Sequence, residues 1–453
     1  MPQDVDLIII GSGQGGVPLA RDYAKAGKRV VMFERGKLGG SCVNYGCTPS
    51  KAFLAAAHTA GRALRGAPLG IHATLEIDVA AVMRRVRSIR DERHDGSEAG
   101  IANAKIDLVR ASAAFNGERT VAGGDREVRA PLVVIDTGTS PKIPTIPGLS
   151  GTPYLTNLTW FDQEVLPKRL IVIGGGYIGL ELGQGARRLG SDVTIVDAGA
   201  HILQNEEADA ADVIAKSFLT DGVALHLAST IDSVSHDGQA FTVTLSDGRK
   251  LEAEGLLIAA GRTPNTPDLA LEKSNIEIQK SGYVRVDDYL QTTCPGVYAL
   301  GDVAGQPAFT HVAWEDYRRL SSTFAGRPRA RNDRALSYST FTEPQLARTG
   351  YTESQAREAG IDCDTRTLQL ADTARGAEWN LTDGFYRLVI DRKTGKMIGA
   401  TLVGYEAGEL IHTIAFAMEL GATWRDLDEF VGIHPTFGES LPSLARLFEF
   451  TAI

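Results

Sequence analysis

At 453 residues the chain is too long for one ordinary hydrophobic core, and roughly two to four domains are expected. Its 43% hydrophobic content and 49 glycines are typical of an α/β protein with many tight turns between strands and helices. The net charge of −9 disfavours nucleic acid or an anionic membrane as the main partner, because both require a concentrated positive surface.

The sequence carries no signal for membrane insertion or export. No apolar run approaches the ~20 residues that cross a bilayer. Residues 1–6 contain acids and lead directly into a strand, unlike the basic and then apolar start of a signal peptide. A cytoplasmic location is therefore expected. Reducing conditions in that compartment favour a catalytic over a structural role for a cysteine pair.

The first predicted unit is a strand, a glycine-rich turn and a helix. Residues 6–10 are typical of a buried parallel strand and residues 17–26 of a helix. The turn between them carries three glycines in a G-x-G-x-x-G pattern: Gly11, Gly13 and Gly16. A second strand over 29–33 ends in Glu34. Such a turn lets the backbone approach a dinucleotide diphosphate, and the acid can accept hydrogen bonds from a ribose diol.

Two cysteines, Cys42 and Cys47, follow within residues 39–51. Their spacing alone is compatible with chance, with half of a metal site or with a redox dithiol. A zinc site would need two further ligands, yet Cys294 and Cys363 stand alone and none of the nine histidines forms a tight pair. We interpret Cys294 and Cys363 as structural or incidental, and no metal site is predicted.

A Cys42–Cys47 bond requires unusual local geometry. On a regular helix residues i and i+5 point about 140° apart, so the first helical turn must be distorted to join them. Thiolates at the start of a helix would feel its positive end, which lowers the pKa of a cysteine and favours thiol exchange.

The next stretch, residues 50–103, is predicted to form helices, with an amphipathic segment over 79–87. Prolines at residues 141–148 then mark a crossover to a second region.

The glycine pattern recurs in this second region. A strand over 169–173 precedes the glycines Gly174, Gly176 and Gly179, and a helix is expected to run to about residue 189. A strand over 192–196 then ends in Asp197. In both copies the acid follows the first glycine by 23 positions. Two matching copies predict two bound dinucleotides.

Asp197 predicts the nicotinamide coenzyme. Its carboxylate would repel a 2′-phosphate, and residues 198–202 contain no arginine to attract one. NADH is therefore expected over NADPH. From residue 335 the pattern changes to strands over 385–390 and 397–403, followed by helices near 410–420 and 440–448.

Several segments together carry a family resemblance. They are the dithiol segment 39–51, Thr137-Gly138-Thr139, residues 261–265, residues 297–302 and residues 434–439. On these motifs the chain resembles the flavoprotein disulfide reductases, which include dihydrolipoamide dehydrogenase, glutathione reductase and mercuric reductase. The resemblance covers essentially the whole chain and implies FAD at the first glycine turn and NAD at the second.

The resemblance also implies an architecture. It is an α/β fold with two Rossmann-like dinucleotide-binding domains and a C-terminal α+β dimerisation domain. The expected limits are 1–147 for the first part of the FAD domain, 148–262 for the NAD domain, 263–334 for the return to the FAD domain and 335–453 for the dimerisation domain. A homodimer with active sites shared between subunits follows.

Catalytic roles follow from the resemblance as well. Cys47 corresponds to the thiol nearest the flavin, and Cys42 to the thiol that exchanges with the substrate. Lys51 corresponds to the partner of Glu181 beside flavin N5. Tyr177 corresponds to the aromatic residue that covers the flavin until nicotinamide displaces it. Without the family context, both Lys51 and Glu181 could equally be ordinary helix residues.

His434 and Glu439 correspond to the acid-base pair that serves the dithiol of the other subunit. An imidazole titrates near working pH, and a hydrogen-bonded carboxylate fixes its tautomer. Alone, a histidine near a C-terminus is more often a surface residue.

The same resemblance assigns the cofactor contacts, with Asp302 expected at the flavin ribityl chain. The expected cofactor-binding residues are Gly11, Gly13, Gly16, Glu34, Gly40, Ser41, Lys51, Gly138, Asp302, Thr310, Gly174, Gly176, Tyr177, Gly179, Asp197 and Gly261.

The sequence indicates the type of reaction more narrowly than it indicates the substrate. The acidic nicotinamide site and residues 434–439 favour a dihydrolipoamide dehydrogenase-like activity, possible partners being lipoyl carrier proteins. Tyr177 and residues 309–318 are closer to mercuric-reductase-like oxidoreductases, but residues 448–453 lack their terminal cysteine pair. Glutathione reduction is disfavoured because the arginines that bind NADPH are missing. A redox-sensing or binding subunit is the alternative from another class.

Overall fold

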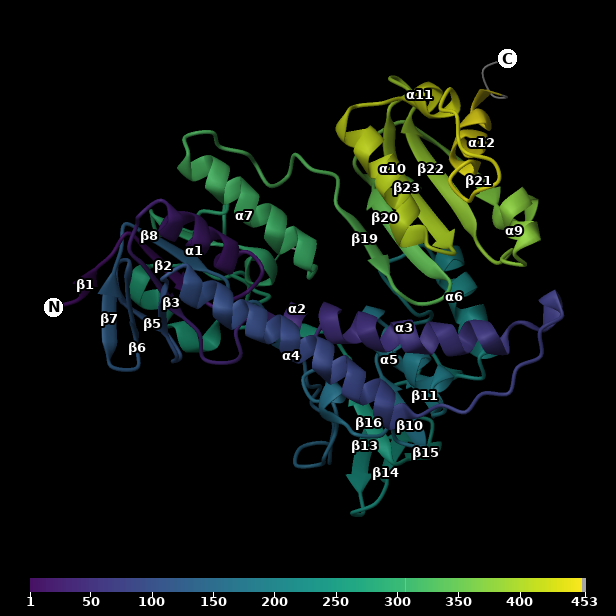
Figure 1. Cartoon of the computed structure of the whole chain (residues 1–453), viewed down its shortest axis with the longest axis horizontal. Coiled ribbons are helices and arrows are strands. Elements are labelled where there is room, and N and C mark those ends of the chain that lie inside the picture. The colour runs from purple at the N-terminus through teal and green to yellow at the C-terminus, as the bar shows by residue number, and fades with distance from the viewer. Residues whose placement is uncertain (306, 450–453) are drawn as a thin grey trace.

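The computed structural model describes residues 1–305 and 307–449. The terminal segment 448–453, which lacks the cysteine pair of mercuric reductases, is described only up to residue 449, so residues 450–453 lie outside this range. The two glycine-turn regions and the C-terminal region form separate lobes, called here the first, second and C-terminal lobes (Figure 1). Among the described residues, no helix combines enough length with enough apolar character to cross a bilayer.

The first lobe is built on a five-stranded parallel sheet in the order β18-β8-β2-β3-β4. Its strands are β2 (Leu7–Ile10), β3 (Val30–Phe33), β4 (Asp107–Val109), β8 (Leu132–Ile135) and β18 (Val297–Ala299). All residues of β2 and β3 are buried, which explains their continuous apolar sequence. Because β18 joins this sheet, the chain returns to the first lobe after passing through the second.

Smaller elements complete the first lobe. A second sheet has the order β1-β7-β6-β5, and β9 pairs with β17 where the chain enters and leaves the second lobe. The bounds are β1 (Gln3–Asp4), β5 (Ala114–Gly117), β6 (Thr120–Gly123), β7 (Arg126–Arg129), β9 (Thr139–Pro141), β17 (Arg262–Pro264), α1 (Gly16–Lys25) and α7 (Thr310–Phe324).

The region predicted to form helices over 50–103 contains separate helices joined by a connection. Helix α2 (Gly40–Asn44) is followed by α3 (Cys47–Leu64), and α4 (Val79–Asn103) returns antiparallel along α3 (Figure 1). Apart from a short 3₁₀ turn at Ala67–Leu69, the chain between α3 and α4 is not helical. The helices predicted for this region are therefore present, and Gly66, Pro68 and Gly70 lie in the connection between them, where they interrupt helical structure.

The second lobe repeats the strand, turn and helix of the first. Its parallel sheet has the order β12-β11-β10-β16, and a three-stranded antiparallel sheet β13-β14-β15 lies beside it. The bounds are β10 (Arg169–Ile173), β11 (Asp192–Val196), β12 (Ala224–His226), β13 (Ile231–His236), β14 (Phe241–Leu245), β15 (Lys250–Ala253), β16 (Gly255–Ile258), α5 (Tyr177–Arg188) and α6 (Ala208–Thr220).

Helices α3 and α5 pack closely where the first and second lobes meet. A Cβ on Gly185 would lie 2.3 Å from the ring of Phe53, so glycine is required for this approach. Phe53, Trp160 and Leu180 belong to one buried core that also includes residues of β10 and α4. The two helices that carry Cys47 and Tyr177 are therefore held in contact by apolar packing.

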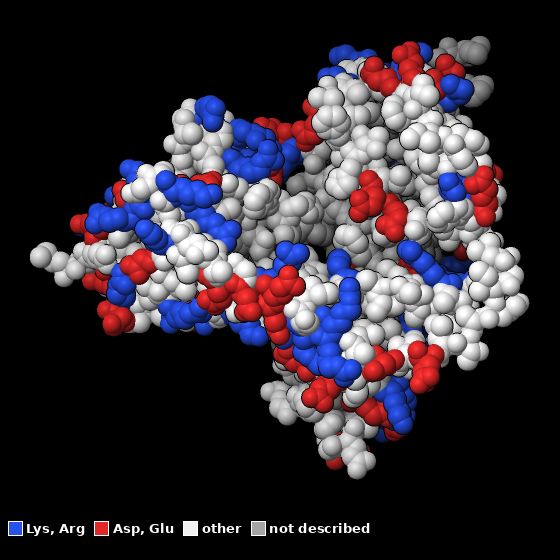
Figure 2. All heavy atoms as spheres, viewed as in Figure 1, with Lys and Arg blue, Asp and Glu red and all other residues white. Residues whose placement is uncertain are grey.

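The C-terminal lobe contains an antiparallel sheet in the order β19-β20-β23-β22-β21. Helix α10 packs on β19, β20 and β23, while α12 packs on β21 and β22 and α11 packs on α12 (Figure 1). The bounds are β19 (Ser337–Thr340), β20 (Gln345–Gly350), β21 (Cys363–Gln369), β22 (Phe385–Asp391), β23 (Met397–Gly404), α8 (Glu353–Glu358), α9 (Ala374–Glu378), α10 (Ala407–Glu419), α11 (Trp424–Asp428) and α12 (Ser440–Arg446). Figure 2 shows acidic and basic side chains interspersed on one face, with a hollow between the first and C-terminal lobes.

Candidate active site

The cysteine pair lies at a break between two helices. Helix α2 ends after Asn44, and α3 begins at Cys47. Between them Tyr45 and Gly46 leave helical geometry, with Gly46 at φ −124° and ψ −118°. This break is the distortion that the five-residue spacing predicts. It places Cys47 in the first turn of an 18-residue helix, at the positive end of its dipole.

The two thiols have different proton affinities. A hydrogen bond from Cys42, with smaller contributions from the Thr310 hydroxyl and the Lys51 charge, lowers the pKa of Cys47 to about 6, although burial opposes this shift. The Cys47 sulfur lies 3.1 Å from the Thr310 hydroxyl oxygen. The same hydrogen bond to Cys47, together with burial, raises the pKa of Cys42. Near neutral pH Cys47 is therefore a thiolate and Cys42 a thiol.

A charged pair joins α3 to α5 beside the cysteines. Lys51 Nζ donates to Glu181 Oε2 at 2.7 Å, and the Glu181 side chain is only 8% exposed. The Lys51 ammonium also lies over the ring of Phe341 at 4.4 Å from its centroid. Lys51 is thus held by Glu181, near enough to Cys47 for its charge to favour the thiolate.

The two glycine turns have equivalent geometry. Gly11 has φ +101° and a Cβ there would lie 2.3 Å from the Asp136 carbonyl oxygen; Gly174 has φ +114° and a Cβ there would lie 2.4 Å from the Ala259 carbonyl oxygen. Only glycine fits at either position. Each turn therefore brings its backbone close to the end of the adjacent strand.

The acids that follow the two turns are also held alike. Glu34 accepts hydrogen bonds from the backbone N–H groups of Ser12 and Gly36, at 2.9 and 2.7 Å. Asp197 accepts from Gly175 and Gly199, at 2.6 and 2.7 Å. Each carboxylate is thereby fixed at the mouth of its glycine turn, where a ribose would lie.

The third glycine of each motif serves packing. A Cβ on Gly16 would lie 2.8 Å from the Ile9 side chain, and one on Gly179 only 2.0 Å from the Gly174 carbonyl oxygen. Both glycines are buried. They allow the helix to approach its turn and strand, so that the N–H groups of the helix start face the binding site.

One cavity of about 2670 Å³ connects these parts. It is lined by both glycine turns, both cysteines and most predicted cofactor residues: Gly11, Gly13, Glu34, Gly40, Ser41, Cys42, Cys47, Lys51, Gly138, Asp302, Thr310, Gly174, Gly176, Tyr177, Glu181, Asp197 and Gly261. A Cβ added to Gly138 or to Gly176 would meet no neighbouring atom within 4 Å, so the cavity wall is open beside their backbone. Gly176 directly precedes α5, and bare backbone at a helix start is a suitable cradle for dinucleotide phosphates.

Asp302 is held at the wall of this cavity. Its carboxylate accepts a hydrogen bond from the Thr139 hydroxyl at 2.9 Å and lies 3.8 Å from the Arg262 guanidinium. Burial raises the pKa of Asp302, while Arg262 opposes the rise. A carboxyl group in this environment can bind the hydroxyl groups of a polyol chain.

Two groups near the cavity were missed in the sequence. Asp136, at the end of β8, accepts a hydrogen bond from Gly16 N at 2.7 Å, and burial raises its pKa well above the usual range. A conspicuous acid after a buried strand was the available signal. Glu206 accepts from the Tyr177 hydroxyl at 2.5 Å and from the Tyr338 hydroxyl at 3.0 Å.

The surroundings of Tyr177 had no signal in the sequence. Glu206 also pairs with Arg348 of the C-terminal lobe at 3.2 Å. The Tyr177 ring lies 5.8 Å from the ring of Phe309, which stacks on Tyr338. Burial and the Glu206 carboxylate raise the pKa of Tyr177. These residues come from distant parts of the chain, so only folding brings them together.

His434 and Glu439 form their predicted pair. His434 Nδ1 lies 2.9 Å from Glu439 Oε2, and 73% of the His434 side chain is exposed. Among the described residues of the single subunit, no polar contact joins His434 to Cys42 or Cys47. The pair is held on a loop before α12, with Nε2 of the imidazole directed away from its carboxylate partner.

The fold and site define a class of protein. Residues 5–316 match the pyridine nucleotide-disulphide oxidoreductase family, and residues 336–445 match the dimerisation domain of that family. The chain therefore belongs to the pyridine nucleotide-disulphide oxidoreductases. It is an oxidoreductase of the FAD- and NAD(P)-dependent kind, and the dimerisation domain supports a homodimer. The family, fold class and cofactors predicted from the sequence are confirmed.

Individual relatives span nearly the whole chain. A mercuric reductase of Bacillus cereus is 34% identical over 455 residues, which cover 98% of this chain and 72% of the relative. A dihydrolipoyl dehydrogenase of Haloferax volcanii is 33% identical over 455 residues, with 97% and 95% covered. Among solved structures, the Cu(II) complex of the HOCl-induced flavoprotein disulfide reductase RclA from Escherichia coli has a TM-score of 0.89 at 32% identity, covering 99% of this chain and 100% of that one.

Proposed function

We propose that this protein passes two electrons between NAD(H), FAD, the Cys42–Cys47 pair and a small dithiol or disulfide, with a dihydrolipoamide-type dithiol as its substrate. The observation that carries the proposal is the single cavity that joins both glycine turns to a low-pKa Cys47. The proposed domain limits are those expected from the sequence, with residues 1–147 and 263–334 in the FAD domain, 148–262 in the NAD domain and 335–453 in the dimerisation domain.

The glycine turns, Glu34 and Asp302 would hold FAD, and Gly174, Gly176 and Asp197 would hold the nicotinamide dinucleotide. Bound FAD supplies two-electron transfer between nicotinamide and sulfur. Lys51 keeps a positive charge beside Cys47, which favours its thiolate. Tyr177 covers the place between the second glycine turn and the cysteines until nicotinamide enters.

The thiol exchange uses the difference between the two cysteines. In the reductive direction His434 of the partner subunit takes the Cys42 proton, and Cys42 attacks one sulfur of the disulfide substrate. The other substrate sulfur leaves as a thiolate and receives that proton. The Cys47 thiolate then attacks Cys42, restores the Cys42–Cys47 bond and releases the second substrate sulfur. The substrate gains the two electrons that the protein dithiol loses.

Asp197 supports NADH as the preferred coenzyme, because its fixed carboxylate would repel a 2′-phosphate. A substitution Asp197→Arg should reduce the preference for NADH over NADPH. Equal use of both coenzymes by the unmodified protein would contradict this part of the proposal.

A metal ion is the second candidate substrate. Mercuric reductases of several bacteria are 33–35% identical to this chain, and the similar RclA structure is a Cu(II) complex. A reactive dithiol can reduce or bind a soft metal ion. The aromatic Tyr177 and residues 309–318 also favour this reading over a purely lipoamide-specific enzyme.

The test is a steady-state assay of the FAD-loaded dimer with a substrate panel. NAD with dihydrolipoamide is compared with NADH and lipoamide, glutathione disulfide, Hg(II) or Cu(II). Dihydrolipoamide turnover that is abolished in Cys42→Ser, with NADH-dependent dye reduction retained, supports the proposal. Turnover of a metal ion alone favours the second candidate. Saturable partner binding with negligible turnover of every substrate would indicate a redox-sensing or binding subunit.

A further inference from the structure

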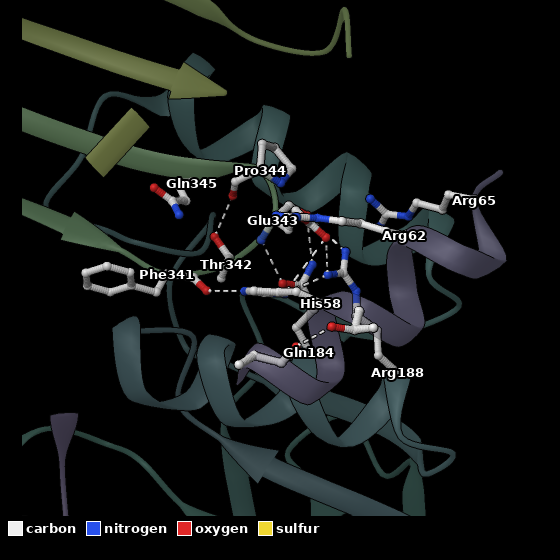
Figure 3. Close-up of polar contacts among 12 residues, drawn as sticks. His58, Arg62, Arg65, Gln184, Arg188, Phe341, Thr342, Glu343, Pro344 and Gln345 are labelled. Atoms are coloured by element: carbon white, nitrogen blue, oxygen red, sulfur yellow. Dashed lines mark hydrogen bonds and ion pairs between the residues drawn. The ribbon is translucent and has the colours of Figure 1, made fainter. Parts of the chain in front are cut away.

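A turn of the C-terminal lobe contacts both helices of the redox site. Residues 341–343 lie between β19 and β20 and reach the facing sides of α3 and α5 (Figure 3). Helix α3 carries Cys47 and Lys51, and α5 carries Tyr177 and Glu181. No sequence motif marked this turn, and the catalytic scheme above does not use it.

Phe341 connects the turn to the Lys51–Glu181 pair in two ways. Its backbone N–H donates to Glu181 Oε1 at 3.0 Å, while Lys51 occupies the other oxygen at 2.7 Å. Its ring lies under the Lys51 ammonium, 4.4 Å from the nitrogen. Both members of the charged pair are therefore oriented by one residue of another lobe.

Glu343 anchors the turn to α5 through its backbone. Its N–H donates to Gln184 Oε1 at 2.8 Å, and its carbonyl accepts from Gln184 Nε2 at 3.0 Å and from the Ser217 hydroxyl at 2.8 Å. Gln184 is completely buried, and it lies one helical turn after Glu181. The backbone of the turn is thus registered against the same helix that carries the catalytic carboxylate.

The Glu343 side chain joins the two helices. One carboxylate oxygen accepts from Arg62 of α3 and the other from Arg188 of α5, each at 2.6 Å. The Arg188 side chain is 2% exposed and that of Glu343 is 13% exposed. A buried ion pair is a poor source of stability, because desolvation offsets its attraction, but its fixed geometry can define one relative position of the groups it joins.

His58 completes the connection on α3. Arg188 is a pure donor and lies 2.9 Å from His58 Nδ1, so Nδ1 must accept and Nε2 must carry the proton. Nε2 then donates to the Phe341 carbonyl at 3.0 Å. Burial lowers the pKa of His58 despite the nearby Glu343 carboxylate, while Arg188 and Arg62 oppose its protonation. Neutral His58 therefore holds Phe341 from the opposite side.

We propose that residues 341–343 are a positioning element of the redox site, in which Glu343 holds Phe341 against the Lys51–Glu181 pair and so keeps Lys51 beside Cys47. The inference rests on the proposed role of the Cys42–Cys47 dithiol. Without Glu343 the turn loses both arginine contacts, Phe341 no longer fixes Glu181, and Lys51 is free to move from Cys47. Docking of the C-terminal lobe thereby controls the reactivity of a thiol in the first lobe.

The test compares Glu343→Ala and Glu343→Gln with Arg387→Gln in the FAD-loaded, dithiol-reduced dimer. Arg387 is a matched control, since it joins the same lobe to the start of α6 through a partly buried contact with Glu207 at 2.9 Å, far along the chain from the turn. The rate of Cys47 alkylation is measured against pH, with FAD content and thermal unfolding recorded for each variant. Alkylation of Cys42 is separated from that of Cys47 by peptide mapping.

We expect the alkylation midpoint of Glu343→Ala to move to higher pH, which lowers its rate at pH 6 by about threefold. Glu343→Gln, which keeps the shape of the side chain and one oxygen that can accept from an arginine, should show a smaller change, and Arg387→Gln none. An unchanged profile in Glu343→Ala, at the same FAD content and with a loss of thermal stability like that of Arg387→Gln, would overturn the inference. Glu343→Gln provides the comparison if the alanine variant does not fold.

The outcome is separable from that of the proposed function. The alkylation profile does not require turnover, so a shift in Glu343→Ala supports the positioning role even if no dithiol in the panel is a substrate. Normal turnover in the unmodified protein with identical profiles in all variants refutes the positioning role alone.

Discussion

At the scale of single residues, the reactivity of this protein depends on an asymmetry between two cysteines. Cys47 begins α3 and accepts a hydrogen bond from Cys42, so the pKa of Cys47 is lowered to about 6. The sequence already predicted a thiolate at a helix start. It did not show the contribution of Thr310, because this residue is 263 positions away along the chain.

Substitutions of Cys42, the hydrogen-bond donor, test whether this bond lowers the pKa of Cys47. Above pH 6 Cys47 is mainly a thiolate, so its alkylation rate in the reduced protein should rise through about pH 6 and then level off. Cys42→Ala removes the donor and should move this midpoint to higher pH. Cys42→Ser retains a hydroxyl donor and should stay close to the unmodified protein. Equal midpoints in both variants would contradict the assigned cause.

Tyr177 gives a second prediction at this scale. Its hydroxyl is held by the buried Glu206 carboxylate, which favours the position seen here. Tyr177→Phe should release the ring and lower the apparent Kd for NADH by about threefold, because the open state becomes more populated. The apparent Kd is measured from the NADH dependence of the rate of flavin reduction in a stopped-flow experiment. Tyr338→Phe removes a hydroxyl from the same carboxylate but not from the covering ring, so it should leave the Kd unchanged.

At the scale of elements, the glycine motifs were predictable because each position meets a local steric requirement. The turns at Gly11 and Gly174 follow buried strands, and the predicted helix limits differ from α1 and α5 by about one residue. Helices were predicted over 50–103, but the limits of the connection between α3 and α4 were not. Gly66, Pro68 and Gly70, which interrupt a helix, lie in that connection.

A single methyl group should test how closely α5 packs on its turn. Gly179→Ala would place a Cβ 2.0 Å from the Gly174 carbonyl oxygen, so the helix must shift. We expect a loss of about 1–3 kcal/mol of stability and an increase of about tenfold in KM for NADH. Flavin absorbance should be unchanged, since the first lobe is not affected.

Gly183→Ala is the matched control for this prediction. It lies one turn further along α5, and its Cβ would make only ordinary contact, 3.4 Å from the Ile195 side chain. Its KM for NADH should remain that of the unmodified protein. If Gly179→Ala also kept the KM of the unmodified protein, the third glycine would not be required for coenzyme binding. Both constants come from initial-rate assays with dye as acceptor.

At the scale of the whole molecule, the active site is expected to need two subunits. His434 and Glu439 pair with each other at 2.9 Å, but His434 is 73% exposed and is not in polar contact with the described cysteines of its own subunit. A partner subunit would bring the imidazole to the dithiol. Loss of this acid-base group should reduce thiol turnover by about 100-fold or more, while NADH-dependent dye reduction persists.

Mixed dimers provide a direct test. His434→Ala and Cys42→Ala homodimers should each be inactive toward thiols. A heterodimer of the two contains one intact site, built from Cys42 of one subunit and His434 of the other. Subunit exchange should therefore restore up to half of the normal activity per heterodimer formed, measured with the same substrate. No recovery after confirmed exchange would mean that each site lies within one chain.

By itself, the sequence determined the family, the two dinucleotide-binding turns and the dithiol. These features depend on short segments, in which a glycine conformation, a strand end or a helix start fixes the geometry locally. The tertiary structure decided what surrounds them. Asp136 meets Gly16, Glu206 meets Tyr177, and Glu343 joins α3 to α5. Their partners lie 29 to 281 positions away, so these contacts form only when the chain folds, and the sequence near each residue does not specify its partner.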